Sequence, residues 1–462
     1  MKNNIGKLGC FLVALLIVLI FYLSYVQLET GPRLAAHPKN QRVLEQISIT
    51  QRGNIYDRNR IPLAETRWVD NHRQRFYPFK NETCHLVGYT SKIYGITGLE
   101  AAYSKQLLGL TAAGRFINLV RKIQGKPPAG EDLVLTLDIK LQHLAAELLA
   151  ETNKPGALVV LDPRTGAVLA AVSQPSFDPN NLEEQWKALI NNRDAPLLNR
   201  AFQGAYPPGS VMKLITAAGA LSAGYTGEEM FHCPGYLMVD GYKLADNGVH
   251  GNINIIEAIV VSCNKVFGKL GLDLGKKNFM QTAEKFGFKQ DFNLSLEVRP
   301  STISSDRDMD EKELASAAIG QGELLVSPLH MALVSATIAN DGVMMQPYLV
   351  QEVISPSGQV LYHHKPSVMQ RAASSTVCAA IRKAMIASVE RGTGKAARIK
   401  NVAVAGKTGT AENEHGQPHA WFVAFAPAHQ PRVAVAVIIE NGGSGGAVAA
   451  PIAKRVIIEA LR

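Results

Sequence analysis

A serine and a lysine three residues apart can act together as a nucleophile and its base, and this chain contains that spacing twice. The S-x-x-K pattern puts a hydroxyl and an amine one turn apart on a helix, so that a deprotonated lysine can remove the serine proton. The two matches are Ser210 with Lys213 and Ser262 with Lys265. Because about one match is expected by chance in a chain of this composition, the surrounding sequence has to distinguish them.

Ser210 has the more informative surroundings. It follows the turn sequence YPPG and precedes the apolar helical pattern VMKLITAAGALSAG. A hydroxyl at the N-terminus of a helix lies near backbone N–H groups and the positive end of the helix dipole, which favour a developing anion. The alternative is an ordinary N-cap serine. Ser262 ends the apolar run IIEAIVV, so we expect Lys265 to point outward.

Two further motifs give the second serine another meaning. Ser262 and Asn264 form an S-x-N pattern 52 and 54 residues after Ser210, and the sequence KTGT begins at Lys407, beside a strand pattern. In order and interval the three motifs resemble the S-x-x-K, S-x-N and K-T-G set of penicillin-binding proteins and serine β-lactamases. The segments NRAFQGAYPPGSVMK, IGQGELLVSPLHMA and AWFVAFAP are similar to the penicillin-binding transpeptidase domain.

The resemblance implies a role for each residue of the first two motifs. Ser210 would be the acyl-enzyme nucleophile and Lys213 its general base, which requires a lowered lysine pKa. Burial and the positive field of Lys407 can supply that shift. Ser262 would relay a proton to the leaving amine, while the Asn264 carboxamide would orient the substrate amide. The alternative for Ser262 and Asn264 is a pair that caps a helix.

In the third motif, Lys407, Thr408 and Thr410 would supply a cation and hydroxyls for the terminal carboxylate of the substrate. The family places one oxyanion N–H on Ser210 and the other on Thr410. Gly409 has no side chain, so we expect a peptide to lie against this strand edge as an added strand.

Four other residues carry weaker signals. Trp421 and Tyr206 are candidates for lining the cleft, with core or rim packing as the alternative. Cys233 and Cys263 can form a disulfide if the chain lies outside the cytoplasm, with two buried free thiols as the alternative. The chain has five cysteines, and no C-x-x-C or His/Cys cluster has the spacing of a zinc site. We therefore expect no metal.

The first 130 residues narrow the resemblance to one class. RGNIYDRNRIPLA at 52–64 and GITGLEAAYSKQLLG at 95–109 resemble the pedestal of class B, or monofunctional, penicillin-binding proteins. A class A enzyme would carry a glycosyltransferase domain, and about a hundred residues are too few for one. They are few even for class B, so we expect a reduced pedestal.

The resemblance implies a two-step acyl transfer. Ser210 would attack the penultimate D-Ala carbonyl of a peptidoglycan stem peptide ending in D-Ala-D-Ala, expel D-Ala, and pass the acyl group to an amine of a neighbouring stem. No cofactor is implied, and β-lactam antibiotics would inhibit covalently. The alternatives are a D,D-carboxypeptidase or β-lactamase-type hydrolase, a non-enzymatic sensor acylated by β-lactams, and a scaffold with a dead site.

Apolar periodicity predicts an α+β fold for the large domain. Strand patterns lie at both ends, in 157–173 and 402–440, and about 220 residues dominated by helical patterns lie between them. One antiparallel sheet would then join the two ends and carry a helical subdomain. The segment GKPPAGED marks a boundary, so we expect an anchor at 1–29, a pedestal at 30–130 and a transpeptidase domain at 131–462.

Between Lys7 and Glu29 run 21 uncharged residues, enough to cross a ~30 Å hydrocarbon core as one helix. The alternative, a cleaved signal peptide, usually has a shorter apolar run and a small-residue cleavage site. The resemblance places the large domain outside the cytoplasmic membrane. It also implies a membrane partner of the SEDS polymerase type, because a monofunctional protein crosslinks glycan that it cannot polymerise.

The net charge of +9 at first suggests a nucleic-acid ligand. However, residues 31–130 contain 16 Lys and Arg against 6 Asp and Glu, whereas residues 131–462 contain 30 against 32. The excess therefore belongs to the pedestal, where basic side chains can meet anionic lipid headgroups or cell-wall polymers. The alternative is a solvated basic face. We expect no nucleic-acid partner.

Overall fold

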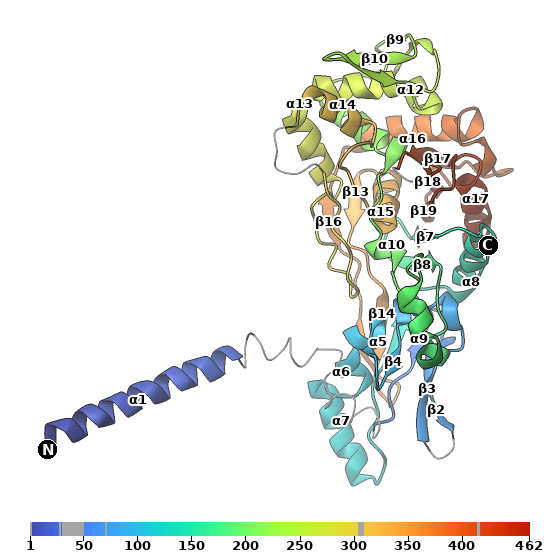
Figure 1. Ribbon diagram of the computed structural model, residues 1–462. Coiled ribbons are helices and arrows are strands. Elements are labelled where there is room, and N and C mark those ends of the chain that lie inside the picture. Colours follow the sequence, from blue (N-terminus) through green and yellow to red (C-terminus); the bar gives the residue numbers. More distant parts are fainter. Residues whose placement is uncertain (1, 27–28, 30–49, 70–71, 304–308, 414–415) are drawn as a thin grey trace.

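The computed structural model describes residues 2–26, 29, 50–69, 72–303, 309–413 and 416–462 (Figure 1). Its N-terminal helix, α1 (Lys2–Tyr25), stands apart from an elongated body. The stretch Gly6–Tyr25 has a mean hydropathy of 2.6 and is not buried against the body. By length and composition, this helix can cross a membrane.

The centre of the body is an antiparallel sheet of five strands in the order β17-β18-β19-β7-β8. Their bounds are β7 (Gly156–Leu161), β8 (Val168–Gln174), β17 (Ala405–Ala411), β18 (His419–Ala426) and β19 (Val433–Ile439). Strands from both ends of the large domain therefore share one sheet, which confirms the α+β prediction.

Hydrophobic residues cover both faces of this sheet. Along β19, Ala434, Ala436 and Ile438 belong to one core cluster, whereas Val433 and Val435 belong to the other. This alternation follows from the period of two along a strand. Helix α15 (Pro328–Ala339) packs on one face, and α8 (Ile139–Ala150) and α17 (Ala449–Ala460) pack on the other.

A helical subdomain covers the β17 side of the sheet, with two small hairpins beyond it (Figure 1). Its helices are α11 (Lys213–Ser222), α12 (Ile255–Val261), α13 (Asn264–Lys285), α14 (Glu311–Ala318) and α16 (Ser375–Glu390). The hairpins pair β9 (Phe231–Cys233) with β12 (Gly251–Ile253), and β10 (Tyr236–Val239) with β11 (Tyr242–Ala245). Short elements complete the domain: η3 (Pro179–Asn181), α9 (Leu182–Asn191), α10 (Arg200–Gln203), η4 (Gly209–Val211), β13 (Val343–Met345), β16 (Val368–Arg371) and η5 (Lys395–Ala397).

The pedestal is built around a six-stranded sheet in the order β15-β14-β6-β1-β2-β3. The strands are β1 (Ile55–Tyr56), β2 (Pro62–Val69), β3 (His72–Phe76), β6 (Asp132–Leu135), β14 (Val350–Ile354) and β15 (Val360–His363). Two strands thus come from far along the chain. The sheet runs across the expected boundary at residue 130, and the division into domains there stays a prediction.

The helices of the pedestal are short. They are η2 (Lys80–Glu82), α4 (Cys84–Val87), α5 (Gly98–Ala102), α6 (Ser104–Leu107) and α7 (Ala112–Ile123), with a two-residue hairpin of β4 (Thr90–Ser91) and β5 (Gly95–Ile96). A buried ion cluster lies in this region. The Glu100 carboxylate accepts from Arg52 Nε and Arg75 Nε at 2.6 Å each, and all three side chains are almost fully buried.

Candidate active site

The three sequence motifs meet in one cleft of about 820 Å³. Each motif comes from a different element: η4 and the start of α11, the junction of α12 and α13, and the strand β17. The cleft is lined by Ser210, Ser262, Asn264, Thr408 and Thr410, among others. The fold therefore brings together residues up to 200 positions apart, as the resemblance implied.

Lys213 lies beneath this cleft with no exposed surface. Its Nζ donates to the Ser262 carbonyl oxygen and to Asn264 Oδ1 at 2.6 Å each, and lies 3.3 Å from Ser262 Oγ. Burial lowers the pKa of Lys213 to about 8, against a smaller opposing effect of Asp246 and Cys263. A lysine with this pKa is partly neutral near pH 8, and a general base must be neutral to accept a proton.

Lys407 is the second buried lysine of the site. Its Nζ donates to Ser262 Oγ at 2.8 Å and to the Thr408 carbonyl oxygen at 2.9 Å. Burial, and then the charge of Lys213, lower the pKa of Lys407 well below its usual range. We expected burial and the charge of Lys407 to lower the pKa of Lys213. Burial does so, but the Coulomb interaction between the two lysines lowers the pKa of Lys407 instead.

The Ser262 hydroxyl lies within reach of both lysine amines. Ser262 ends α12 in the left-handed region, at φ 63° and ψ 40°, which is uncommon for residues other than glycine. This turn sends the next residues into α13, so that Asn264 becomes the first residue of that helix. The geometry suits transfer of a proton through Ser262 between the lysines and the cleft.

The second S-x-x-K match does not form a catalytic pair. Lys265 Nζ lies 5.9 Å from the centre of the Phe231 ring. The lysine amines that lie near Ser262 Oγ are those of Lys213 and Lys407.

β17 is an edge strand of the five-stranded sheet, where its neighbour is β18. This leaves its other edge toward the cleft, as expected for pairing with a substrate peptide. The structure gives a second physical reason why position 409 is a glycine. A Cβ there would lie 2.8 Å from Trp421 Cβ and 3.0 Å from Val211 Cγ2, so glycine is needed for η4 to pack on the strand. Thr408 Oγ1 is 2.6 Å from Thr393 Oγ1.

The sequence analysis missed Asp246, which holds the S-x-N motif in place. Its carboxylate accepts from the backbone N–H groups of Asn264 and Lys265 at 2.9 Å each. Hydrogen bonds from these groups and from the Cys263 thiol outweigh burial and keep the Asp246 pKa below its usual value. In the sequence, Asp246 stands in the turn signal Asp-Asn-Gly, which gives no indication of function.

Asp246 also belongs to a cluster that the sequence spacing did not reveal. One ligand atom from each of Cys233, Asp246, His250 and Cys263 lies within 4.8 Å of the other three. Cys263 Sγ and Cys233 Sγ lie 2.9 and 3.3 Å from Asp246 Oδ2, and Cys233 Sγ is 3.5 Å from His250 Nδ1. Two thiols, an imidazole and a carboxylate are a donor set that suits tetrahedral zinc. In the structure both cysteines are free thiols, not a disulfide.

Trp421 and Tyr206 pack in the core, not in the cleft. Trp421 is fully buried and its Nε1 donates to the Pro207 carbonyl oxygen at 3.0 Å. Tyr206 donates to Glu440 Oε1 at 2.7 Å, and its ring meets that of Trp421 edge to face at 6.1 Å. These contacts support the YPPG turn just before Ser210 from below.

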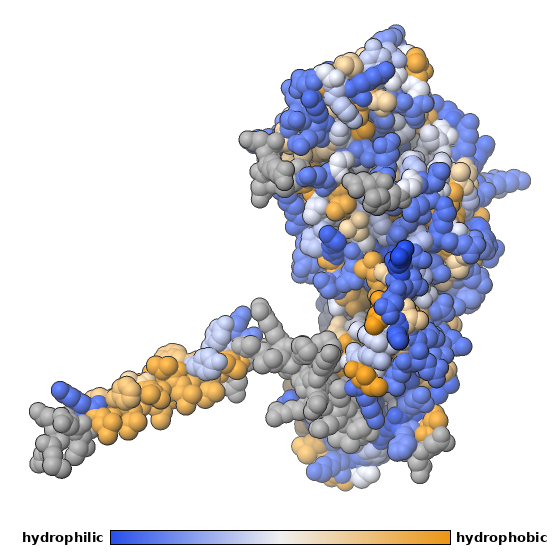
Figure 2. All heavy atoms as spheres, in the orientation of Figure 1, coloured by the Kyte–Doolittle hydropathy of each residue, from blue (hydrophilic) through white to orange (hydrophobic). Residues whose placement is uncertain are grey.

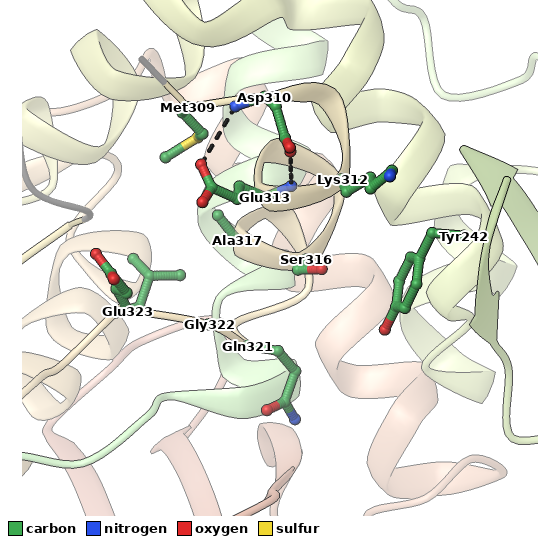
Figure 3. Close-up of a pocket in the computed structure, with 11 residues that line it drawn as sticks. Tyr242, Met309, Asp310, Lys312, Glu313, Ser316, Ala317, Gln321, Gly322 and Glu323 are labelled. Atoms are coloured by element: carbon green, nitrogen blue, oxygen red, sulfur yellow. Dashed lines mark hydrogen bonds between the residues drawn. The ribbon is translucent and has the colours of Figure 1, made fainter. Parts of the chain in front are cut away.

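A second pocket, of about 350 Å³, opens beside the cleft (Figure 3). The two cavities share the lining residues Tyr242, Ser316, Gln321 and Gly322. Figure 3 shows Tyr242 facing α14, whose first turn is closed by reciprocal hydrogen bonds between Asp310 and Glu313. The cleft therefore extends past the motif residues toward the helical subdomain.

A serine at the start of a helix, two buried lysines on a shared hydroxyl, and an edge strand beside them define a serine acyltransferase of the penicillin-recognising class. Residues 156–458 match the penicillin binding protein transpeptidase domain, and residues 52–133 match the penicillin binding protein A dimerisation domain. The chain belongs to the class B penicillin-binding proteins, and it is a peptidoglycan D,D-transpeptidase.

Named relatives and solved structures agree with this assignment. The chain is 34% identical to the peptidoglycan D,D-transpeptidase PbpA of Mycolicibacterium smegmatis, over 100% of this chain and 99% of the relative. It is 31% identical to the peptidoglycan D,D-transpeptidase MrdA of Acinetobacter baumannii, over 93% of this chain and 72% of that relative. The ceftriaxone acyl-enzyme complex of penicillin-binding protein A from M. tuberculosis superimposes with a TM-score of 0.86 at 34% identity, over 91% of this chain and 100% of that one.

Proposed function

We propose that Ser210 is the residue that carries the acyl group in this transpeptidase. The observation that carries the proposal is the meeting of Ser210, the Lys213–Ser262–Lys407 hydrogen bonds and the β17 edge in one cleft. Lys213 lies three residues after Ser210, at the start of α11, and is buried without a carboxylate partner among the described residues. It accepts the Ser210 proton as the Ser210 Oγ–acyl bond forms.

The two lysines divide the work through their protonation. A stem peptide brings its terminal carboxylate to Lys407, Thr408 and Thr410, and this negative charge raises the pKa of Lys407. Lys407 then holds the proton, and Lys213 is the neutral base. When the C–N bond to D-Ala breaks, the proton returns through Ser262 to the leaving amine.

In the second step the acceptor amine attacks the Ser210 ester and loses a proton to Lys213, and the Ser210 oxygen leaves with a proton. The Ser210 and Thr410 N–H groups stabilise the oxyanion in both steps. The Asn264 Nδ2–H group donates to the Ala245 carbonyl oxygen at 2.9 Å. This hydrogen bond orients the carboxamide so that its Oδ1 accepts from Lys213. This arrangement favours Asn264 as a positioning group as well as a substrate contact.

Intact-protein mass spectrometry with penicillin G tests the nucleophile. We expect one penicilloyl adduct on the full chain and no adduct on Ser210→Ala. An adduct that persists in Ser210→Ala would overturn the assignment. Release of D-Ala from a stem pentapeptide, measured with and without an acceptor amine, separates transfer from hydrolysis: transfer requires that the acceptor amine appear in the product.

The membrane arrangement is also part of the proposal. We propose that α1 crosses the cytoplasmic membrane once and that the body lies on the outer side, where its stem-peptide substrate is found. Labelling of intact cells with a membrane-impermeant thiol reagent tests this arrangement. We expect a cysteine introduced at exposed Met238 to be labelled and one introduced at Asn3 to be protected; the reverse pattern contradicts it.

The implied partner is a SEDS-type glycan polymerase, bound through the anchor or pedestal. Monofunctional class B proteins crosslink strands that another enzyme must make, and the two family models that match this chain describe a transpeptidase domain and a dimerisation domain. We expect co-purification with such a polymerase to be lost when α1 is replaced by an unrelated membrane-spanning helix. Unchanged recovery after replacement of both the anchor and the pedestal surface contradicts this partnership.

A further inference from the structure

Helix α7 of the pedestal is attached to the body through its polar face. Asn118 Oδ1 accepts from the Ala129 N–H at 2.9 Å, and Arg121 Nε donates to the Pro127 carbonyl oxygen at 2.9 Å. Gly114 lies on the same face and is buried; a Cβ there would come within 2.8 Å of both Glu131 Oε1 and Gly109. The contacts that hold this helix are therefore mostly hydrogen bonds and close backbone packing.

The apolar face of the same helix points away from the body. Phe116, Leu119, Val120 and Ile123 follow the i, i+3, i+4, i+7 spacing of one helical stripe, and they are 68%, 56%, 38% and 80% exposed. A helix on the surface of a soluble protein normally turns such a stripe toward the core. A contiguous apolar stripe that faces outward marks an interaction surface.

The charges beside this stripe are all positive. Arg115 and Lys122 are seven residues apart, so they lie on one flank of the helix, and Lys126 follows three residues after the helix ends; all three are exposed. The sequence from 112 to 130 contains no Asp or Glu. A helix with an apolar face and a basic flank is the pattern of helices that lie in the interface of anionic membranes.

A second element presents apolar side chains at the same end of the molecule. The hairpin of β2 and β3 extends to the lower end of the body, as α7 does (Figure 1). Near its tip, Trp68 and Val69 are 67% and 44% exposed. Figure 2 shows hydrophobic residues at this lower end among hydrophilic ones. Tryptophan is enriched where a protein meets the headgroup region of a bilayer.

We infer that this end of the pedestal rests on an anionic lipid bilayer, with the apolar stripe of α7 in the headgroup region and Trp68 as a second contact. A bilayer supplies hydrocarbon and negative charge together, as the surface requires. A second copy of the chain would instead bring Arg115, Lys122 and Lys126 against the same three cations. The contact sets the height and tilt of the catalytic cleft above the membrane. The inference rests on the proposed membrane anchoring by α1, which keeps the pedestal near the lipid.

Spin labelling of the full chain in vesicles tests the contact. In a Cys10→Ser background, whose other described cysteines are buried, a nitroxide is placed at Ile123→Cys. The matched control is Met238→Cys, another exposed apolar position (52%), in β10 at the opposite end of the body. In phosphatidylglycerol-containing vesicles we expect the label at 123 to collide preferentially with oxygen, and the label at 238 to collide preferentially with a water-soluble nickel chelate.

Two results overturn the inference. If the label at 123 meets the nickel chelate as often as the label at 238, the stripe is in water. If it is shielded from both oxygen and chelate, protein covers the stripe, as in an association between copies. Resistance to alkaline carbonate extraction is measured on the same vesicles. Release of the chain by carbonate would show that anchoring by α1 has failed, which is a separate conclusion.

A charge variant tests the lipid chemistry. Arg115→Gln, Lys122→Gln and Lys126→Gln together are expected to reduce the docked population on the order of a hundredfold, since each basic residue near an anionic surface contributes a factor of about five and the three factors multiply. Penicillin acylation and carbonate resistance are expected to stay at the wild-type level, which shows that the chain is folded and anchored. A docked population that is unchanged in the variant, or equal in pure phosphatidylcholine vesicles, contradicts recognition of anionic lipid.

Discussion

Two buried groups of basic residues in this protein have opposite surroundings. In the pedestal, Arg52 and Arg75 share the carboxylate of Glu100 at 2.6 Å each. In the cleft, Lys213 and Lys407 are equally buried, but their hydrogen-bond acceptors are carbonyl and hydroxyl oxygens and the Asn264 carboxamide. Burial lowers the pKa of Arg52 as well, but a guanidinium keeps its proton in proteins, and the carboxylate pairs with its charge. Without one, burial lowers the pKa of both lysines, so that their protons can move.

The comparison indicates what each group contributes. Burial alone would raise the pKa of Glu100, but Arg75 and Arg52 outweigh it and the net pKa is lowered, so the cluster stays ionised. Removing one partner of such a cluster strongly destabilises the fold, and its groups do not exchange protons. The two lysines have lowered pKa values and can lose a proton, which the proposed role of Lys213 as a general base requires.

The largest expected effect is that of removing proton transfer while keeping the charge. Lys213→Arg keeps a cation, but a guanidinium does not lose its proton in proteins. We expect the rate of acylation by penicillin to fall by about 10²–10⁴-fold, the usual contribution of a general base. In the wild type the rate should rise with pH through about 8, as Lys213 becomes neutral. Stopped-flow acylation against pH measures both results, and a rising limb that persists unchanged in the variant contradicts the role of Lys213.

The next effect concerns the pedestal cluster. Glu100→Gln leaves two buried arginines without a carboxylate, and we expect the free energy of unfolding to fall by about 3–5 kcal/mol. Glu352→Gln is the control, because its partners Arg60 and His363 are both half-exposed and such surface pairs contribute about 0–1 kcal/mol each. Chemical unfolding of the full chain in detergent measures both variants. Acylation by the folded fraction should not change, and a slowed acylation rate would show that the two buried groups are coupled.

A metal ion beside the cleft would place a fixed positive charge near Lys213 and Lys407, which form no ion pair among the described residues. If Cys233, Asp246, His250 and Cys263 bind zinc, both thiols lose their protons. We expect about one equivalent of zinc in the purified chain, and chelation to lower the midpoint of thermal unfolding by several degrees. Elemental analysis and thermal shift measure these outcomes, with Cys378→Ser as the control for a buried cysteine outside the cluster. Full stability in the absence of metal, or a Cys233–Cys263 disulfide in the mass spectrum, contradicts it.

The parts of the molecule that sequence predicts are those with local signals. Continuous apolar runs indicated β7, β8, β18 and β19, because a strand buried on both faces has apolar side chains at nearly every position. The residues of the candidate site could be proposed from the sequence because each motif is short and stands beside a recognisable helix or strand. Helix starts carry a local signal too: the Asp138 carboxylate accepts from the Lys140 and Leu141 N–H groups, as an N-cap at the start of α8 requires.

The remainder depends on contacts between distant segments. Asp246 and His250 come from a turn and Cys233 from the end of a short strand, so their spacing along the chain matches no zinc motif. The pairing of β14 with β6 is likewise not encoded near either strand. The outward apolar face of α7 was missed for a different reason. Helical periodicity identifies an amphipathic helix, but it does not tell whether the apolar face meets a core or a membrane.

The smallest expected effect distinguishes the two S-x-x-K matches. Lys265 follows the second motif serine by the same three residues that separate Lys213 from Ser210. Its amine lies 5.9 Å from the centre of the Phe231 ring, whereas Lys213 is fully buried beneath the cleft. We expect Lys265→Gln to change the acylation rate by less than about twofold, because it removes no group that touches Ser210, Ser262 or the reacting atoms. Its backbone N–H, which donates to Asp246, is kept in the variant. The same stopped-flow assay measures it beside Lys213→Arg. If both substitutions slow acylation equally, the burial of Lys213 does not set it apart from Lys265. The acylation rate would then depend on the positive field of nearby cations and not on one buried amine.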